Sequence, residues 1–248
     1  MNIFLTLAFL FYIGCTLGWV LELFFRRIVH KKWINPGFLT GPYLPLYGFG
    51  LCFLYIICSM DLSFITSAAW RYVFLIAVIT VTMTLLEYIA GVIFIKGMKI
   101  KLWDYSDRWG NIQGIICPLF TLAWGAVGAI YLFFVHKNIL GALDWLAENL
   151  AFSFVIGAFF GVFSVDLVYS LKLGAKIRAW AKKNDVVVRY ERFKMAVKDA
   201  AEKGKEKLSF LFPFTFRTVW EKLENYKQSR TQNAGKWKFF KKNNKNDE

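Results

Sequence analysis

Residues 70–95 read WRYVFLIAVITVTMTLLEYIAGVIFI, and the charged side chains in this run are Arg71 near its start and Glu87 near its end. About 20 apolar residues in a helix cross the ~30 Å hydrocarbon core of a bilayer. A charged side chain at the centre of such a helix costs about 2.5–3.5 kcal/mol on insertion scales, so it is seldom present without a function. This stretch therefore predicts a membrane-spanning helix that carries a polar site.

The rest of the chain is similarly apolar. The 248 residues are 57% hydrophobic and the mean hydropathy is +0.42, which exceeds what a soluble domain of this size needs. We predict an all-α polytopic membrane bundle with a transmembrane domain over residues 1–171 and a short interfacial helix at residues 138–150. Its predicted spans cover residues 3–25, 43–60, 70–95, 114–136 and 151–171. The second span is the weakest, because Pro45, Gly48 and Gly50 interrupt its start.

Charge divides the chain at residue 171. Residues 1–171 carry ten Lys/Arg and eight Asp/Glu, whereas residues 172–248 carry 21 and nine. The loops after the first, third and fifth spans hold most of the basic residues, which places them in the cytoplasm by the positive-inside rule. We expect a multi-pass protein of the plasma (inner) membrane with its N-terminus outside. A basic cytoplasmic tail over residues 172–248 should be helical at first and disordered over 236–248.

The tail combines basic residues with a partial apolar stripe that includes Trp180, Phe193 and Val197. A basic segment next to a membrane is attracted to the anionic lipids of the inner leaflet. Nucleic acid is the alternative partner, but no groove-reading motif supports it. The tail is therefore expected to bind membrane lipids.

The two halves of the transmembrane domain have a similar order of residues. In each, a glutamate near the inner end of a span precedes a Trp-x-Asn sequence and then a Pro- and Gly-marked entry to the next span. The first half has Glu22 and Asn35, and the second has Glu87 and Asn111. Thirteen residues separate the first pair and twenty-four the second, so a parallel duplication is suggested but not established by the spacing.

Several of these motifs carry a family resemblance. GWVLE (18–22), NPGFLTGP (35–42), PLYG (45–48), LEYIAG (86–91), WDYS (103–106) and NIQG (111–114) resemble the CmpB-like type IV family of bacterial ABC-transporter permeases. The resemblance covers about residues 1–170 and leaves the long tail out. It implies a small polytopic membrane protein and a transport function, without catalytic residues that could be carried over.

We predict a polar site near the cytoplasmic ends of the helices. Its candidate residues are Glu22, Glu87, Asp104, Asn35, Asn111 and Asp166. Each has a structural alternative. Glu22 can pair with Arg26 one turn away, Asp166 can bond to backbone or to Ser170, and Asp104, Asn35 and Asn111 can hold turns. Glu87 has no basic residue at helical spacing, so its partner must come from another helix, water or a solute. Together the acidic groups would suit a cation, an amine-bearing solute or proton coupling.

Other chemistries find little support in the sequence. No P-loop motif is present, so an ATP-driven function would need a separate ATPase subunit. We expect no metal site and no cofactor, since His30 and His136 lie at opposite faces by the predicted topology and the four cysteines lie in apolar spans.

We favour a permease-like transport component over an enzyme. The alternatives are a membrane-embedded enzyme that uses the carboxylates as acid and base on a lipid substrate, and a scaffold that acts through its tail. Five helices leave little room for a wide pathway, so a homodimer is also a hypothesis.

Overall fold

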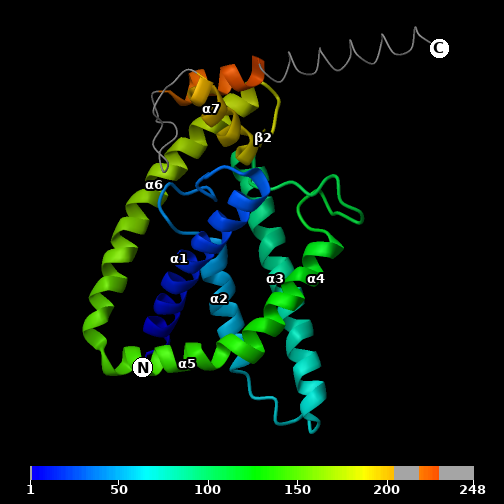
Figure 1. Ribbon diagram of the computed structural model, residues 1–248, viewed down its shortest axis with the longest axis vertical. Helices are drawn as coiled ribbons and strands as arrows, with labels where there is room; N and C mark the ends of the chain where they lie inside the picture. The colour runs from blue at the N-terminus through cyan, green and yellow to red at the C-terminus, as the bar shows by residue number, and fades with distance from the viewer. Residues whose placement is uncertain (1, 204–217, 229–248) are drawn as a thin grey trace, which may run out of the picture.

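The computed structural model describes residues 2–203 and 218–228, and within them almost all regular structure is helical (Figure 1). The prediction of an all-α polytopic bundle is confirmed. The segment expected to be disordered, 236–248, lies outside the described residues. The main helices are α1 (Ile3–His30), α2 (Pro45–Cys58), α3 (Ala68–Met98), α4 (Pro118–Ile130), α5 (His136–Glu148), α6 (Ser153–Lys183) and α7 (Tyr190–Lys203).

Four helical stretches in the described residues are long and apolar enough to cross a membrane: Ile3–Val29, Ala68–Met98, Pro118–Glu148 and Leu150–Lys183. The remaining predicted span, α2, has 14 residues, about 21 Å at 1.5 Å per residue. It begins at Pro45, because proline lacks an N–H and is best accommodated in the first turn of a helix. This helix is therefore shorter than the bilayer core, and it packs between α1 and α3.

The chain changes direction after α4. A π-helical segment, η1 (Tyr131–Val135), joins α4 to α5, and α5 lies crosswise to α3 (Figure 1). A π segment interrupts the regular α-helical hydrogen bonding, which allows such a reorientation. Helix α5 occupies the stretch for which a short interfacial helix was predicted and buries Ile139, Leu143 and Leu146. A 3₁₀ turn, η2 (Leu150–Phe152), then leads into α6.

The two motif-bearing loops and the C-terminal segment gather at one end of the molecule, opposite the N-terminus (Figure 1). These loops are residues 31–44, the first loop, and residues 99–117, the second loop. Strand β1 (Ile100–Lys101) of the second loop pairs in parallel with β2 (Val188–Arg189), which follows α6. The structure therefore brings together the segments that hold most of the basic residues in the described part of the chain.

The apolar stripe of the tail is buried inside the protein. We call residues 173–203 the C-terminal cap; it comprises the end of α6, β2 and α7. Trp180, Phe193 and Val197 are at most 3% exposed and form a core with Phe38 and Ile100 of the two loops. The stripe is thus covered by the two loops.

Helices α1 and α2 approach closely at two glycines. A Cβ on Gly14 would lie 2.9 Å from the Cα of Gly48, and a Cβ on Gly48 would lie 2.9 Å from the backbone oxygen of Phe11. Small residues allow the backbones of membrane helices to meet in this way. The close contact fixes Tyr47, the residue before Gly48, against α1.

We expect Gly48→Leu to destabilise the protein by about 1–3 kcal/mol, because the added side chain has no space between α1 and α2. The matched control is Gly141→Leu on α5, where an added Cβ meets no atom of another described segment within 4 Å. Thermal unfolding in detergent measures both variants. Equal melting temperatures for the two would contradict the close packing.

Candidate functional site

Glu87 lies in α3 and is 4% exposed. The Tyr105 hydroxyl donates to its Oε1 at 3.0 Å, and the Trp124 indole N–H donates to its Oε2 at 3.0 Å. Tyr105 comes from the second loop and Trp124 from α4, so the partners come from outside the helix. Both donors are neutral, and no salt bridge to Glu87 is found among the described residues. Glu87 is therefore a buried carboxyl group without a cationic partner in this part of the chain.

Glu22 lies in α1 and has a different environment. Its Oε1 accepts a hydrogen bond from Arg26 Nε at 3.1 Å, and its Oε2 accepts one from the Tyr47 hydroxyl at 2.9 Å. The Arg26 guanidinium also pairs with Glu191 of α7 at 2.5 Å. The structure thus has the i,i+4 pair that the sequence offered as the structural alternative for this residue.

An aromatic pair connects the two glutamates. The rings of Tyr47 and Trp124 have centroids 6.4 Å apart and meet edge to face. Tyr47 donates to Glu22 and Trp124 donates to Glu87. In both halves of the domain, a glutamate on one long helix accepts a hydrogen bond from an aromatic residue of the following helix. Both of those following helices begin with proline. We refer to Glu22, Tyr47, Trp124, Glu87 and Tyr105 as the glutamate cluster.

Asp166 belongs to a separate network on α6. It is 8% exposed, and its Oδ2 accepts from the backbone N–H groups of Gly41 at 2.7 Å and Thr40 at 3.1 Å. Its Oδ1 accepts from Ser170 Oγ at 3.0 Å and from the Thr40 hydroxyl. The backbone and Ser170 are the partners that the structural alternative from the sequence named, and the Thr40 hydroxyl adds to them. Asp166 therefore holds the first loop in place, and none of its hydrogen bonds reaches the glutamate cluster.

Asn35 holds the same loop from within. The residue is 3% exposed, its Oδ1 accepts from Trp19 Nε1 at 2.7 Å, and its Nδ2 donates to the Thr40 carbonyl at 2.7 Å. From the other side, Lys194 Nζ donates to the carbonyls of Asn35 at 3.1 Å and Gly37 at 2.7 Å. The loop thus presents amide N–H groups to a carboxylate and carbonyl groups to a lysine.

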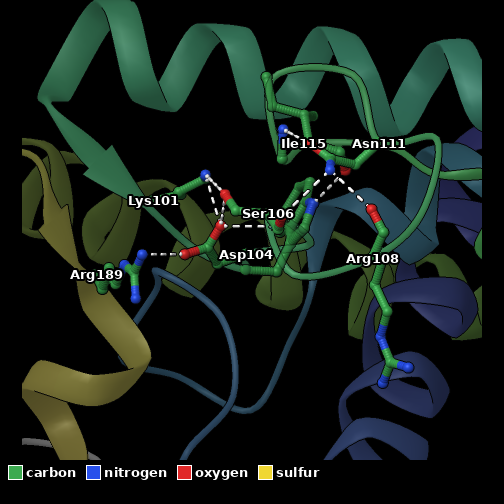
Figure 2. Close-up of polar contacts among 9 residues, drawn as sticks. Lys101, Asp104, Ser106, Arg108, Asn111, Ile115 and Arg189 are labelled. Carbon is green, nitrogen blue, oxygen red and sulfur yellow. Dashed lines mark hydrogen bonds and ion pairs between the residues drawn. The ribbon is translucent and has the colours of Figure 1, made fainter.

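Asp104 and Asn111 organise the second loop (Figure 2). Asp104 Oδ1 accepts from Lys101 Nζ at 2.7 Å and Ser106 Oγ at 2.6 Å, and its Oδ2 pairs with Arg189 at 2.9 Å. Burial raises the pKa of Asp104, but the hydrogen bonds from Lys101 and Ser106 outweigh it and lower the pKa to about 2. This carboxylate is therefore ionised and neutralised by two cations.

The Asn111 side chain closes the turn that follows. Its Nδ2 donates to the carbonyls of Arg108 at 2.8 Å and Ser106 at 3.2 Å, while its Oδ1 accepts from the Gly114 N–H at 2.9 Å. Gly114 has φ +64°, and a Cβ there would lie 3.1 Å from Asp104 Oδ1, so glycine is required. Asn111 and Gly114 thus maintain the conformation of the second loop. The Arg108 side chain points away from Asn111 (Figure 2).

The six candidate residues therefore fall into three groups. Glu22 and Glu87 share the glutamate cluster, Asp166 and Asn35 hold the first loop, and Asp104 and Asn111 hold the second. Sequence reasoning missed the residues that contact these groups or their partners from distant segments. The matching Tyr-Gly and Trp-Gly pairs of the two halves were a signal for Tyr47 and Trp124. Tyr105, Arg189, Glu191 and Lys194 gave none, because their partners lie far away in the chain.

Comparison with known proteins identifies the family. Residues 9–171, more than half of the chain, match the family described as “Putative ABC-transporter type IV”. No curated protein and no solved structure matches the chain. The chain belongs to this family, which confirms the resemblance carried by its motifs. With its membrane-length helices, it is a membrane protein related to transport.

The buried Lys194 predicts a pH dependence of stability. Burial, with a further contribution from Arg26, lowers its pKa from 10.5 to about 7. The unfolded chain therefore binds more protons than the folded protein between pH 7 and 10.5, and stability should rise with pH there by at most about 1.4 kcal/mol per unit. The gain is lost as the pH falls through 7.

Thermal unfolding at pH 6 and pH 8.5 measures this effect. We expect Lys194→Met to flatten the difference between the two pH values, whereas Lys182→Met, which removes an exposed lysine of α6, should preserve it. An unchanged pH profile in Lys194→Met would show that other groups cause the dependence.

Proposed function

We propose that the protein is a permease-like transport component whose polar site is built around Glu87 and Glu22 near the cytoplasmic ends of α1 and α3. One observation carries this proposal: Glu87 is 4% exposed, and its hydrogen-bond donors within residues 2–203 and 218–228 are both neutral. Ionisable groups inside membrane helices are costly and mark the pathways of ions and polar solutes. Family membership supports the same conclusion.

Comparison with the other three carboxylates singles out Glu87. Glu22 pairs with Arg26, Asp104 pairs with Lys101 and Arg189, and Asp166 is bound by the backbone of the first loop. Glu87 alone among these four combines burial with hydrogen bonds from phenol and indole groups only. A buried carboxyl group with no cationic partner among the described residues suits an organic cation or an amine-bearing solute, which would supply the opposite charge.

We further propose the topology that the charge distribution predicts. The end with the two loops and the C-terminal cap faces the cytoplasm, and the N-terminus lies outside. The basic residues of the cap would then meet the anionic inner leaflet. The protein would lie in the plasma membrane as a multi-pass component.

The proposed assembly has two parts. The family suggests association with an ATPase subunit, which would supply the P-loop that this chain lacks. A homodimer would widen the pathway beyond what the helices of one protomer enclose. Helix α6 offers a surface for it, because Gly157 and Gly161 are spaced four apart. A Cβ added at either glycine would meet no atom of another described segment within 4 Å.

A membrane enzyme is the alternative function, with Glu22 and Glu87 as base and acid. The contacts favour transport, because the ion pair with Arg26 occupies the Glu22 carboxylate that an acid–base mechanism would use. A scaffold that acts through its tail would not need the buried glutamates.

We expect Glu87→Gln to abolish complementation of a deletion strain while the protein still inserts into the membrane at normal levels. The substitution preserves volume and removes the charge on which solute binding would depend. Trp124→Phe, which removes one donor to Glu87, should reduce function less. The matched control is Glu148→Gln, an exposed position at the end of α5.

Full function of inserted Glu87→Gln would overturn the proposed site. If function is lost, assays in proteoliposomes decide between the candidate functions. Uptake of cationic solutes that fails in Glu87→Gln supports transport, whereas turnover of lipid by the purified wild-type protein would establish the enzyme.

A further inference from the structure

The C-terminal cap holds the first loop through a row of contacts from α7. Lys194 Nζ donates to two loop carbonyls, and Lys198 Nζ donates to the Trp33 carbonyl at 2.8 Å. Lys32 of the loop pairs with Asp199 and, at 3.1 Å, with Glu202. Lys194 is 7% exposed, and a buried lysine donating to backbone carbonyls is a specific contact that random packing of a basic tail would not produce.

The same cap holds the second loop through β2. The Val188 N–H donates to the Lys99 carbonyl at 2.9 Å, and β2 pairs with β1 in register. Arg189, the register partner of Lys101, also pairs with Asp104, three residues after that lysine, at 2.9 Å. A segment of 16 residues, Val188–Lys203, therefore ties together two loops that are more than 50 residues apart in the chain.

Both attachments lead to the glutamate cluster. Arg26 bridges Glu22 and Glu191, so α7 shares a cation with one glutamate. Tyr105, which donates to Glu87, directly follows Asp104, the residue that Arg189 holds. Displacement of the cap would release the partner of Arg26 and the loop that carries Tyr105. The cap lies over the end of the molecule at which α1 and α3 finish (Figure 1).

We propose that the C-terminal cap is a latch that closes the cytoplasmic end of the glutamate cluster and opens by releasing the two loops. The latch itself is argued from contacts alone. The inference rests on the proposed function only for the nature of the solute that would pass through the opened end. The contacts at the edge of the cap suit reversible release. The side chains of Arg189, Lys32 and Asp199 are 35%, 36% and 48% exposed, and exposed ion pairs are individually weak and screened by salt.

A native cysteine reports the opening without any solute. Cys117 is the last residue of the second loop, directly before α4, and is 2% exposed. In inside-out membrane vesicles, a membrane-impermeant maleimide should label Cys117 only when the latch opens. Peptide mass spectrometry separates this residue from Cys15, Cys52 and Cys58, which lie in the apolar helices and serve as internal references.

The first variant loosens the latch by Lys194→Met and Arg189→Met together. We expect labelling of Cys117 to accelerate about tenfold, since local opening becomes easier when its contacts are removed. The control carries Arg178→Met and Lys182→Met, which remove two exposed basic residues of the same cap, and should label as slowly as the wild type. Equal labelling of the loosened variant and the control would overturn the proposal.

The second variant locks the latch. Its result can be interpreted even if the loosened variant does not fold. Lys32→Cys and Asp199→Cys replace an ion pair between the loop and α7, and a short thiol-cleavable reagent bridges them. Labelling of Cys117 should fall below the wild-type rate and recover after reduction. An unchanged rate in the bridged protein would contradict the latch. Because no solute is involved, that result would leave the test of Glu87 untouched.

Discussion

The buried carboxyl group of Glu87 is the constraint around which the loop-bearing half of this bundle is arranged. A carboxyl group in a helix that crosses hydrocarbon must find hydrogen-bond partners inside the protein, because lipid offers none. Its partners are Tyr105 and Trp124, which come from the second loop and from α4. Satisfying this one side chain therefore fixes α4 against α3 and folds the second loop over the end of both. The edge-to-face contact of Tyr47 with Trp124 extends the arrangement to α1 and Glu22.

The same requirement explains the first and second loops. Irregular backbone near the membrane has polar groups that need partners, and here charged side chains supply them. Asp166 accepts from two amide N–H groups of the first loop, while Lys194 donates to two of its carbonyls. Asp104 performs the corresponding task in the second loop. Several acidic residues of this family member are thus structural, and the one without a cation or backbone amide as partner stands apart from them.

The general architecture and part of the site could be predicted from the sequence, because both depend on local patterns. Apolar runs predicted the membrane helices, and i,i+4 spacing gave the Glu22–Arg26 pair as the structural alternative for Glu22. The lack of a basic residue near Glu87 predicted that its partner comes from elsewhere. The missed features all need contacts between distant segments. Nothing in the tail indicates that Lys194 meets the first loop, and the stripe around Phe193 reads equally well as a lipid-facing or a protein-facing surface. The sequence pattern marked Pro45 as an interruption of the second span. In the structure Pro45 begins α2, which is why this helix is short.

The central claim is that Glu87 is chemically distinct from the other buried acidic groups. A hydrophobic carbodiimide modifies carboxyl groups within a bilayer that are not held in ion pairs, and peptide mass spectrometry of treated membranes locates the modified residue. The account predicts rapid modification of Glu87, slow modification of Glu22, which Arg26 holds, and slow modification of Asp166, which the first loop holds. Modification of Glu22 or Asp166 as fast as that of Glu87 would contradict the account.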